Sequence, residues 1–229
     1  MPSDETTPRL APRLISFDVF GTLISVRESS YAAFERILAA ADASHVDVRA
    51  FWEHWEERNI ALYWGPYRPY RAICAQSLAE TFAHFGIAGD PGLIGFYFDA
   101  FPSFFLYDDV LPTLERLSSK ARLAVVSNID DDLLAATPLP RYFDLVCTAE
   151  RARGYKPDGT LFRYLLDNAG VPRADILHAG QSQFTDLVGG KPLGLTIAWI
   201  NRRGIALDGR VPRPDYVLTD IAGLLDLVV

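Results

Sequence analysis

The chain has 229 residues, of which 49% are hydrophobic and 22% charged, which is enough apolar material to bury a core. Its formal charge of -7 excludes the basic surface typical of nucleic-acid-binding proteins and favours a small-molecule substrate. No apolar stretch reaches the length of a membrane span, and residues 1–12 lack the apolar centre of a signal peptide, so we expect a cytoplasmic protein without membrane contact.

The first part of the chain predicts one strand followed by helices. After a loose tail over residues 1–11, the apolar run Leu14–Phe17 predicts a buried strand. Apolar residues then recur at helical spacing, which predicts helices over residues 31–41, 51–62 and 70–85, and an aromatic stretch ends at Pro102. Residues 27–104 are therefore predicted to form a helical insert.

Beyond residue 104, strands and helices alternate again. Apolar runs predict strands at 123–126, 145–147, 176–179, 196–200 and 216–218, and amphipathic spacing predicts helices at 111–117, 159–169, 185–193 and 221–227. Short apolar strands that alternate with helices indicate a parallel sheet covered on both faces. The predicted fold class is α/β, with a core of residues 12–26 and 105–229 and a helical cap of residues 27–104.

Asp18 stands where the first predicted strand stops, and it is the candidate nucleophile. Gly21 permits a tight turn behind it, and parallel sheets bind ligands at the carboxyl ends of their strands. A carboxylate held there can attack an electrophilic centre and form an ester or an acyl phosphate. Taken alone, the segment also fits an ordinary Asp-containing turn.

Three later segments carry polar groups that complement Asp18. Ser127 and Asn128 can donate hydrogen bonds to an anionic group, and Lys156 can keep Asp18 ionised. Asp186 could orient Lys156, polarise a water or bind a metal. Each segment also has a structural interpretation, and the acids 130–132 are expected to satisfy the N-terminus of the helix that follows them.

The order Asp-x-x-Gly-Thr, Ser-Asn, Lys-Pro and Gly-x-Ser-x-x-x-Asp resembles the four motifs of the haloacid dehalogenase (HAD) superfamily of hydrolases. Residues 17–23, 127–130, 154–158 and 199–202 resemble its 2-haloacid dehalogenase branch in particular. The resemblance covers nearly the whole chain. It implies a Rossmann-like core with an inserted cap, and it gives the role of nucleophile to Asp18.

The resemblance also gives expectations for the rest of the site. Lys156 and Asp186 are expected to join Asp18 as catalytic residues by activating the water that hydrolyses an aspartyl ester. Thr22, Ser127 and Asn128 are expected to hold the substrate carboxylate or to orient Asp18. The remaining predicted substrate-binding residues are Phe20 and Ser182.

Two departures from the superfamily pattern argue against a phosphatase. Phe20 occupies the position where HAD phosphatases carry a second aspartate, and a phenylalanine cannot transfer a proton. Gln181 replaces an acidic residue of the magnesium-binding members, which weakens a site for a hard cation. We therefore expect no metal and no other cofactor, and Mg²⁺ would be needed only by a phosphatase.

A third departure leaves the leaving group open. Haloacid dehalogenases use a cap arginine to receive the halide, and the matching position here is Glu53. Arg58, Arg68 and Arg71 lie nearby in the sequence. The related azetidine-carboxylate hydrolases resemble the chain around residues 127–130 and displace nitrogen rather than halide.

The sequence thus predicts a hydrolase that acts through an aspartyl ester on a small carboxylic acid, similar to a 2-haloacid dehalogenase. The alternatives are a magnesium-dependent phosphatase and a non-catalytic binding module, and the resemblance is compatible with a homodimer. Residues 64–70 predict either a substrate pocket or a packed turn. The remaining residues of note are expected to be structural: His178 and Trp199 in the core, Arg202 and Arg203 in a solvated loop, and Cys74 and Cys147 as buried thiols.

Overall fold

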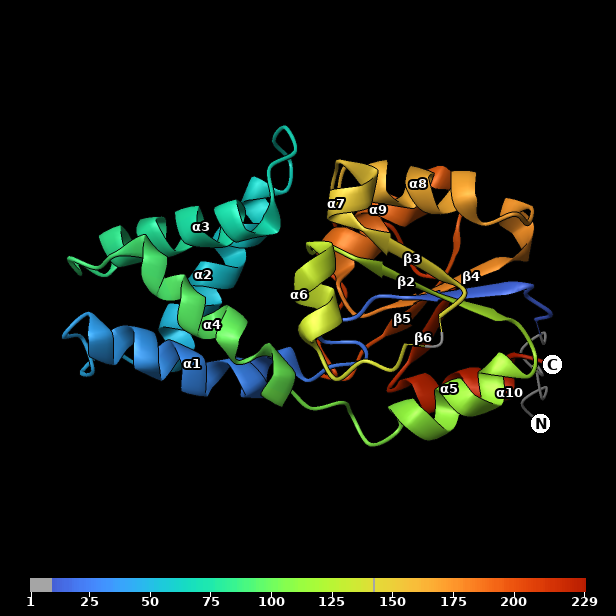
Figure 1. Cartoon of the computed structure of the whole chain (residues 1–229). Coiled ribbons are helices and arrows are strands. Elements are labelled where there is room, and N and C mark those ends of the chain that lie inside the picture. Colours follow the sequence, from blue (N-terminus) through green and yellow to red (C-terminus); the bar gives the residue numbers. More distant parts are fainter. Residues whose placement is uncertain (1–9, 142) are drawn as a thin grey trace.

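A computed structural model of the chain describes residues 10–141 and 143–229, so most of the predicted N-terminal tail lies outside the described residues. Figure 1 shows two parts side by side. One is a sheet with helices on both faces, and the other consists of helices alone. We call these the core and the helical lobe, and the lobe comprises residues 26–103.

The sheet has six strands in the order β3-β2-β1-β4-β5-β6, and every neighbouring pair is parallel. The strands are β1 (Leu14–Phe17), β2 (Arg122–Ser127), β3 (Leu145–Thr148), β4 (Ile176–Gly180), β5 (Thr196–Ile200) and β6 (Tyr216–Leu218). This is the Rossmann-like order, in which the direction of winding reverses between β1 and β4. The predicted fold class is confirmed, and the reversal places a crevice beyond the carboxyl ends of these two strands.

The core helices cover both faces of the sheet. They are α5 (Val110–Ser118), α6 (Asp131–Ala136), α7 (Ala149–Ala152), α8 (Thr160–Asn168), α9 (Val188–Gly190) and α10 (Leu224–Leu227), with short turns η3 (Arg173–Asp175), η4 (Gln183–Leu187), η5 (Lys191–Leu193) and η6 (Ile221–Gly223). Along β1, Leu14 packs in the cluster that contains α8, whereas Ile15 packs in the cluster that contains α5 and α10. Side chains that alternate in this way bury a strand on both faces.

Two predicted helices are less regular than their apolar spacing indicated. The segment predicted as one helix over residues 185–193 consists of the π-helical turn η4, the short α9 and the 3-10 turn η5. Gly189, Gly190 and Pro192 fall in this segment, and glycine and proline both disfavour a continuous helix. The C-terminal helix likewise begins as the 3-10 turn η6.

The helical lobe contains α1 (Val26–Ala40), α2 (Val48–Leu62), α3 (Tyr70–His84) and α4 (Gly95–Asp99), with the 3-10 turns η1 (Pro91–Ile94) and η2 (Phe101–Ser103). Aromatic rings fill its centre: the ring of Phe34 lies 4.9 Å from that of Trp55 and 5.7 Å from that of Tyr97. The domain boundaries at residues 27 and 104 stay a prediction, which the start of α1 and the end of η2 support.

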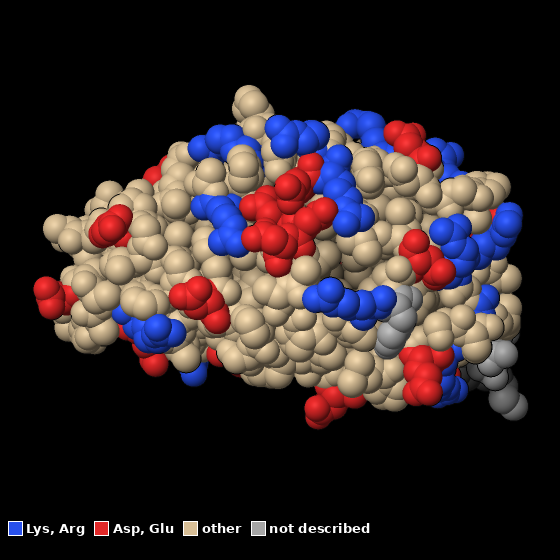
Figure 2. Space-filling view, in the orientation of Figure 1, with Lys and Arg blue, Asp and Glu red and all other residues tan. Residues whose placement is uncertain are grey.

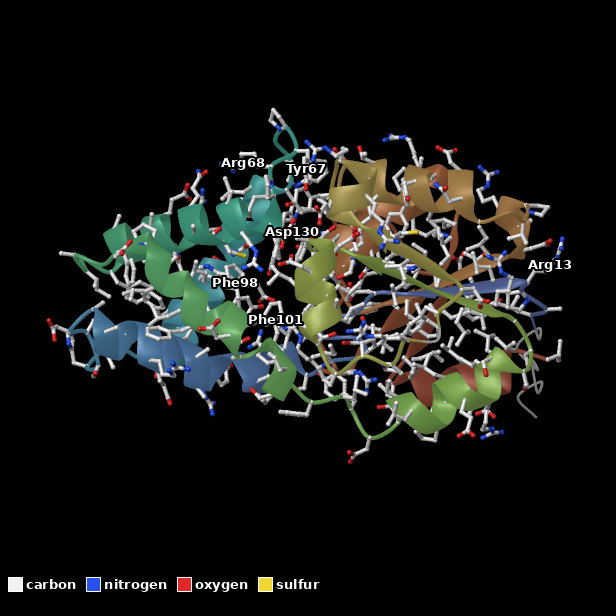
Figure 3. The ribbon with its side chains drawn as sticks, in the orientation of Figure 1. Arg13, Tyr67, Arg68, Phe98, Phe101 and Asp130 are labelled. Atoms are coloured by element: carbon white, nitrogen blue, oxygen red, sulfur yellow. The ribbon has the colours of Figure 1, made fainter. Side chains whose placement is uncertain are left out.

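Asp130 joins the two parts of the molecule. Figure 3 shows it at the start of α6, at the face of the core that meets the lobe. Its carboxylate accepts hydrogen bonds from the backbone N–H groups of Tyr70 (2.8 Å) and Arg71 (3.1 Å), at the start of α3. It makes no side-chain capping bond to its own helix. The expectation that Asp130 satisfies the N-terminus of α6 is therefore wrong, because the carboxylate satisfies the N-terminus of α3 instead.

The face seen in Figure 2 carries both acidic and basic side chains, including an acidic patch with basic side chains on its flanks. Examples at the junction of core and lobe are the ion pairs Arg71–Asp132 and Arg151–Asp131. None of the described helices has the length and apolarity needed to cross a membrane. Both cysteines are free thiols buried in the interior.

Candidate active site

Asp18 lies just past the carboxyl end of β1, and both of its carboxylate oxygens are engaged. The hydroxyl of Thr22 donates a hydrogen bond of 2.7 Å to Oδ2, and the ammonium of Lys156 contacts Oδ1. Gly21 has a φ of +85°, and a Cβ there would lie 2.9 Å from Cγ of Gln181. The turn behind the carboxylate therefore requires glycine, as the sequence indicated.

Lys156 reaches Asp18 from a loop that two other segments hold in place. Its backbone N–H donates to Oδ1 of Asn128 at 2.9 Å. On the other side of the loop, a Cβ built on Gly189 would overlap the carbonyl oxygen of Lys156, so α9 packs directly on the loop backbone. The Nζ of Lys156 also donates to Oδ1 of Asp186 at 2.9 Å, and the lysine side chain is only 2% exposed.

Asp186 lies behind Lys156 and is fully buried. Its Oδ2 accepts a hydrogen bond of 3.0 Å from the backbone N–H of Ser182, and its Oδ1 lies 3.2 Å from Nε2 of His178. Because an ionised carboxylate can only accept, Nε2 of His178 donates to Asp186, and Nδ1 shares a hydrogen bond of 2.9 Å with the hydroxyl of Ser16. His178 is a satisfied core residue, but it also supports Asp186, which the sequence reasoning missed.

The charges of these groups depend on one another. Burial raises the pKa of Asp18, and the Lys156 ammonium opposes that rise. Burial acts on Asp186 in the same direction, but Lys156 and His178 outweigh it and lower the pKa of Asp186 to about 2. Burial would lower the pKa of Lys156, yet the two carboxylates raise it, so the lysine stays charged.

A cavity of about 90 Å³ opens above Asp18, between the ends of the strands and the helical lobe. Its floor is formed by core residues: Asp18, Phe20, Ser127, Asn128, Lys156, Gln181, Ser182 and Thr185. Its roof is formed by lobe residues: Val26, Trp52, Trp55, Glu56, Asn59, Ile60, Tyr63, Tyr70 and Tyr97. An apolar and aromatic roof over a floor with a few polar groups is typical of a small-molecule site.

Most of the predicted site residues meet at this cavity. Six of the eight line it: Asp18, Phe20, Ser127, Asn128, Lys156 and Ser182. Thr22 and Asp186 are fully buried beside it instead. Thr22 thus contacts Asp18 rather than the cavity, and Asp186 contacts Lys156.

The arginines considered for a halide site lie elsewhere. Arg58 pairs with Glu80 and Arg71 pairs with Asp132, each at 2.6 Å, and Arg68 donates to Gln76. No arginine is among the described residues that line the cavity. Glu53, at the position of the halide arginine, pairs with Arg27 and is not among the residues that line the cavity.

Other predicted residues divide between the site and the scaffold. In the stretch 64–70 only Tyr70 lines the cavity, whereas Trp64 is 56% exposed and Tyr67 stacks on Tyr155. Trp199 is buried as expected, and its indole N–H donates to the carbonyl of Gln181.

Arg202 is not a solvated loop residue. Two of its nitrogens donate to the carboxylate of Asp109 at 2.9 Å each, and its Nε donates to the carbonyl of Thr22 at 3.0 Å. The expectation was wrong because the partner Asp109 lies far away in the sequence. Arg202 thus connects the turn that contains Thr22 to Asp109.

The arrangement supplies a nucleophile, a neighbouring cation and hydrogen-bond donors at one cavity. Within residues 10–141 and 143–229, no group of three or more His, Cys, Asp or Glu side chains is placed to hold a metal ion. The cation beside Asp18 is the ammonium of Lys156.

Comparisons with known proteins agree with this geometry. A family model described as haloacid dehalogenase-like hydrolase matches residues 12–194. The (S)-2-haloacid dehalogenase 4A of Burkholderia cepacia is 25% identical over 202 residues, which is 84% of either chain.

Two solved structures share the fold over nearly the full length. A crystal structure of a dehalogenase with an intermediate complex has a TM-score of 0.82 at 22% identity and covers 96% of this chain and 98% of its own. The L-2-haloacid dehalogenase from Xanthobacter autotrophicus with chloropropionic acid covalently bound has a TM-score of 0.79 at 22% identity, covering 93% of this chain and 96% of its own.

Proposed function

The chain belongs to the haloacid dehalogenase-like hydrolases, and from this premise we propose that it cleaves a bond between carbon and a leaving group, a halide or a related group, in a small carboxylic acid. The reaction would pass through an ester formed on Asp18. The relatives named above act on 2-haloacids or hold chloropropionic acid covalently, as their names state. The first fact supports reaction at a carbon centre, and the second supports a covalent intermediate.

The observation that carries the proposal is the pair of residues Asp18 and Phe20 at one cavity. Asp18 has a cation beside it and a fixed orientation, as a nucleophile requires. Phe20 packs on Phe101, with the ring centroids 5.5 Å apart, where a phosphatase would need an acid. Displacement at carbon followed by ester hydrolysis has no step that depends on an acid at that position.

In the first step, an oxygen of Asp18 attacks the carbon and the leaving group departs with the bonding electron pair. Lys156 would hold the carboxylate ionised and oriented, and Thr22 would fix its other oxygen. Ser127 and Asn128 at the cavity floor would bind the substrate carboxylate. The lobe covers the cavity and would keep water away during this step.

In the second step, water attacks the carbonyl carbon of the ester, which releases a hydroxy acid and restores Asp18. Lys156 is the charged group nearest to that carbonyl, so it would stabilise the developing negative charge. Asp186 has no access to the cavity and would act by holding Lys156.

A single turnover in oxygen-18 water tests the proposal. Enzyme in excess would be mixed with (S)-2-bromopropionate, oxirane-2-carboxylate or azetidine-2-carboxylate. The mass of the peptide that contains Asp18 would then be measured by mass spectrometry. We expect the label in Asp18 and not in the first product molecule, because water attacks the ester carbonyl. Label in the product alone would show direct attack by water and would rule out the ester.

A further inference from the structure

The cavity carries more negative than positive charge. Among the described residues that line it, Lys156 is the only one with a positive charge, and its ammonium contacts both Asp18 and Asp186. The roof adds a further acid, Glu56. An anion expelled from the substrate would therefore find no uncompensated cation in the cavity.

Glu56 faces the cavity because of its place on α2. The lining residues Trp52, Trp55, Glu56, Asn59, Ile60 and Tyr63 recur at helical spacing and form one face of this helix. Glu53 and Glu57 lie on the same helix but are not part of the lining. Only one of the three acids on this stretch of α2 can meet a ligand in the cavity.

The carboxyl group of Glu56 is available to a ligand. It accepts no hydrogen bond from any residue that the structure describes, and its nearest cation is Arg27, with Nη2 at 4.0 Å. The other terminal nitrogen of Arg27 donates to Glu53 at 2.6 Å. Asn59, the next polar group on this face, is already satisfied, because its amide nitrogen donates to the carbonyl of Trp55 and its oxygen accepts from Cys74.

The environment of Glu56 also favours its protonated form. Burial raises its pKa above the usual 4.5, Arg27 and Arg203 oppose the rise, and Glu53 and Glu57 add to it. The other titratable groups at the roof are Tyr63, Tyr70 and Tyr97, and burial raises the pKa of each phenol, so they stay neutral.

We propose that Glu56 handles the leaving group, and that the atom expelled is an oxygen or a nitrogen that departs bonded to hydrogen rather than a halide. The inference rests on the proposed function, because it assigns the leaving-group side of the same displacement. A carboxyl group that accepts no hydrogen bond from the described residues and lines the same cavity as the nucleophile can donate a proton when protonated or bind an N–H group when ionised. In neither form does it offer the positive charge that a departing halide needs.

The electrons and protons balance in both cases. With an oxygen leaving group, Asp18 forms the C–O ester bond, the broken bond leaves its pair on the oxygen, and Glu56 transfers its proton there. With a ring ammonium, the nitrogen keeps the pair of the broken C–N bond, and the Glu56 carboxylate accepts a hydrogen bond from its N–H. Hydrolysis of the ester then releases one proton, which returns to Glu56 or to the freed amine.

The test compares the wild type with Glu56→Gln and with the matched control Glu57→Gln, which changes an exposed acid one position further along α2. The probes are oxirane-2-carboxylate, azetidine-2-carboxylate and (S)-2-bromopropionate, and kcat is measured for each across pH 5 to 9. A thermal melt of each variant checks that it is folded. Glu56→Asp, which keeps an acid, serves as the conservative variant.

We expect the wild type to open at least one ring substrate faster than it displaces bromide. In Glu56→Gln the ratio of the ring rate to the bromide rate should fall about 100-fold, the usual contribution of a general acid. Glu56→Asp should have a ratio between those of Glu56→Gln and the wild type, and Glu57→Gln should keep the wild-type ratio. For the oxirane, a fall of the rate with rising pH that Glu56→Gln abolishes identifies proton donation by Glu56. For the azetidine, ionisation of Asp18 also lowers the rate in acid, so only the part of the fall with falling pH that Glu56→Gln removes identifies binding of an ammonium by Glu56.

Two results would overturn the inference while leaving the ester mechanism intact. One is that oxygen-18 appears in Asp18 during turnover of bromopropionate while neither the oxirane nor the azetidine ring is opened. The other is an equal fall of all three rates in Glu56→Gln. Turnover of none of the probes, or turnover without label in Asp18, would overturn the proposed function and this inference with it.

Discussion

The carboxylate of Asp130 accepts a hydrogen bond of 2.8 Å from the backbone N–H of Tyr70, and this bond ties the core to the first turn of α3. A second bond from Arg71 N–H uses the other carboxylate oxygen. An acid at a helix N-terminus also interacts favourably with the helix dipole. The position of the lobe over the site thus depends on a side chain of the core.

Replacing Asp130 by alanine should destabilise the protein by about 1–3 kcal/mol, because two backbone N–H groups lose their acceptor in a buried setting. Urea unfolding measures the change. The matched control is Asp132→Ala, which removes an exposed ion pair with Arg71 and should cost less than about 1 kcal/mol. Equal losses in the two variants would show that the bonds to α3 have no special weight.

The pH at which activity is lost on the acid side of the pH profile, which we call the acid limb, should depend on Thr22. Attack requires ionised Asp18, so activity is lost as pH falls through a pKa that burial raises above 3.8. Thr22→Val removes a hydrogen bond that favours the ionised form, so the limb should move to higher pH and kcat/KM should fall about 10-fold at neutral pH. Thr22→Ser keeps the hydroxyl and should shift the limb less, which a pH profile of the pair would show.

Asp186 should contribute to stability at neutral pH and lose that contribution in acid. Its folded pKa of about 2 lies below the usual 3.8, so the unfolded chain binds the proton first as pH falls. The contribution, about 2 kcal/mol, is present above pH 3.8 and is lost as pH falls toward 2. The free energies of unfolding of wild type and Asp186→Asn should therefore converge over that range. A constant gap would contradict the assignment.

Gly189 should be intolerant of a side chain. A Cβ there overlaps the carbonyl oxygen of Lys156, so Gly189→Ala should displace the lysine loop, cost about 1–3 kcal/mol or more, and lower activity. Gly95→Ala is the control, since a Cβ at that helical position meets no atom within 4 Å. It should be neutral or stabilising by up to about 1 kcal/mol. Thermal melts and turnover rates of both variants provide the comparison.

The sequence predicted the parts of the fold that depend on local pattern. Apolar runs located all six strands, and the rule that ligands bind at strand ends indicated that Asp18 and Ser127 lie at one edge of the sheet. Lys156 lies in a loop after a short helix, and the order of the motifs and the resemblance to the HAD superfamily grouped it with Asp18. The helix over residues 185–193 was predicted too regular, because apolar spacing alone does not register the effect of paired glycines.

Contacts between distant segments were beyond the reach of the sequence. Asp130 and Tyr70 are 60 positions apart, and nothing in the local pattern of either residue names the other. The same holds for the pair of Arg202 and Asp109, which are 93 positions apart. The sequence indicates Glu53 at the leaving-group position, but the roof residue is Glu56, about one helical turn later, because the rotation of α2 about its axis is set by packing.

The cavity draws its floor from the core and most of its roof from one face of α2. Substitutions on that face can change which molecules are accepted while the nucleophile and its lysine keep their surroundings. Selection, or an engineer exchanging only this helix surface, would then have a way to diversify substrates without rebuilding the bond-breaking apparatus.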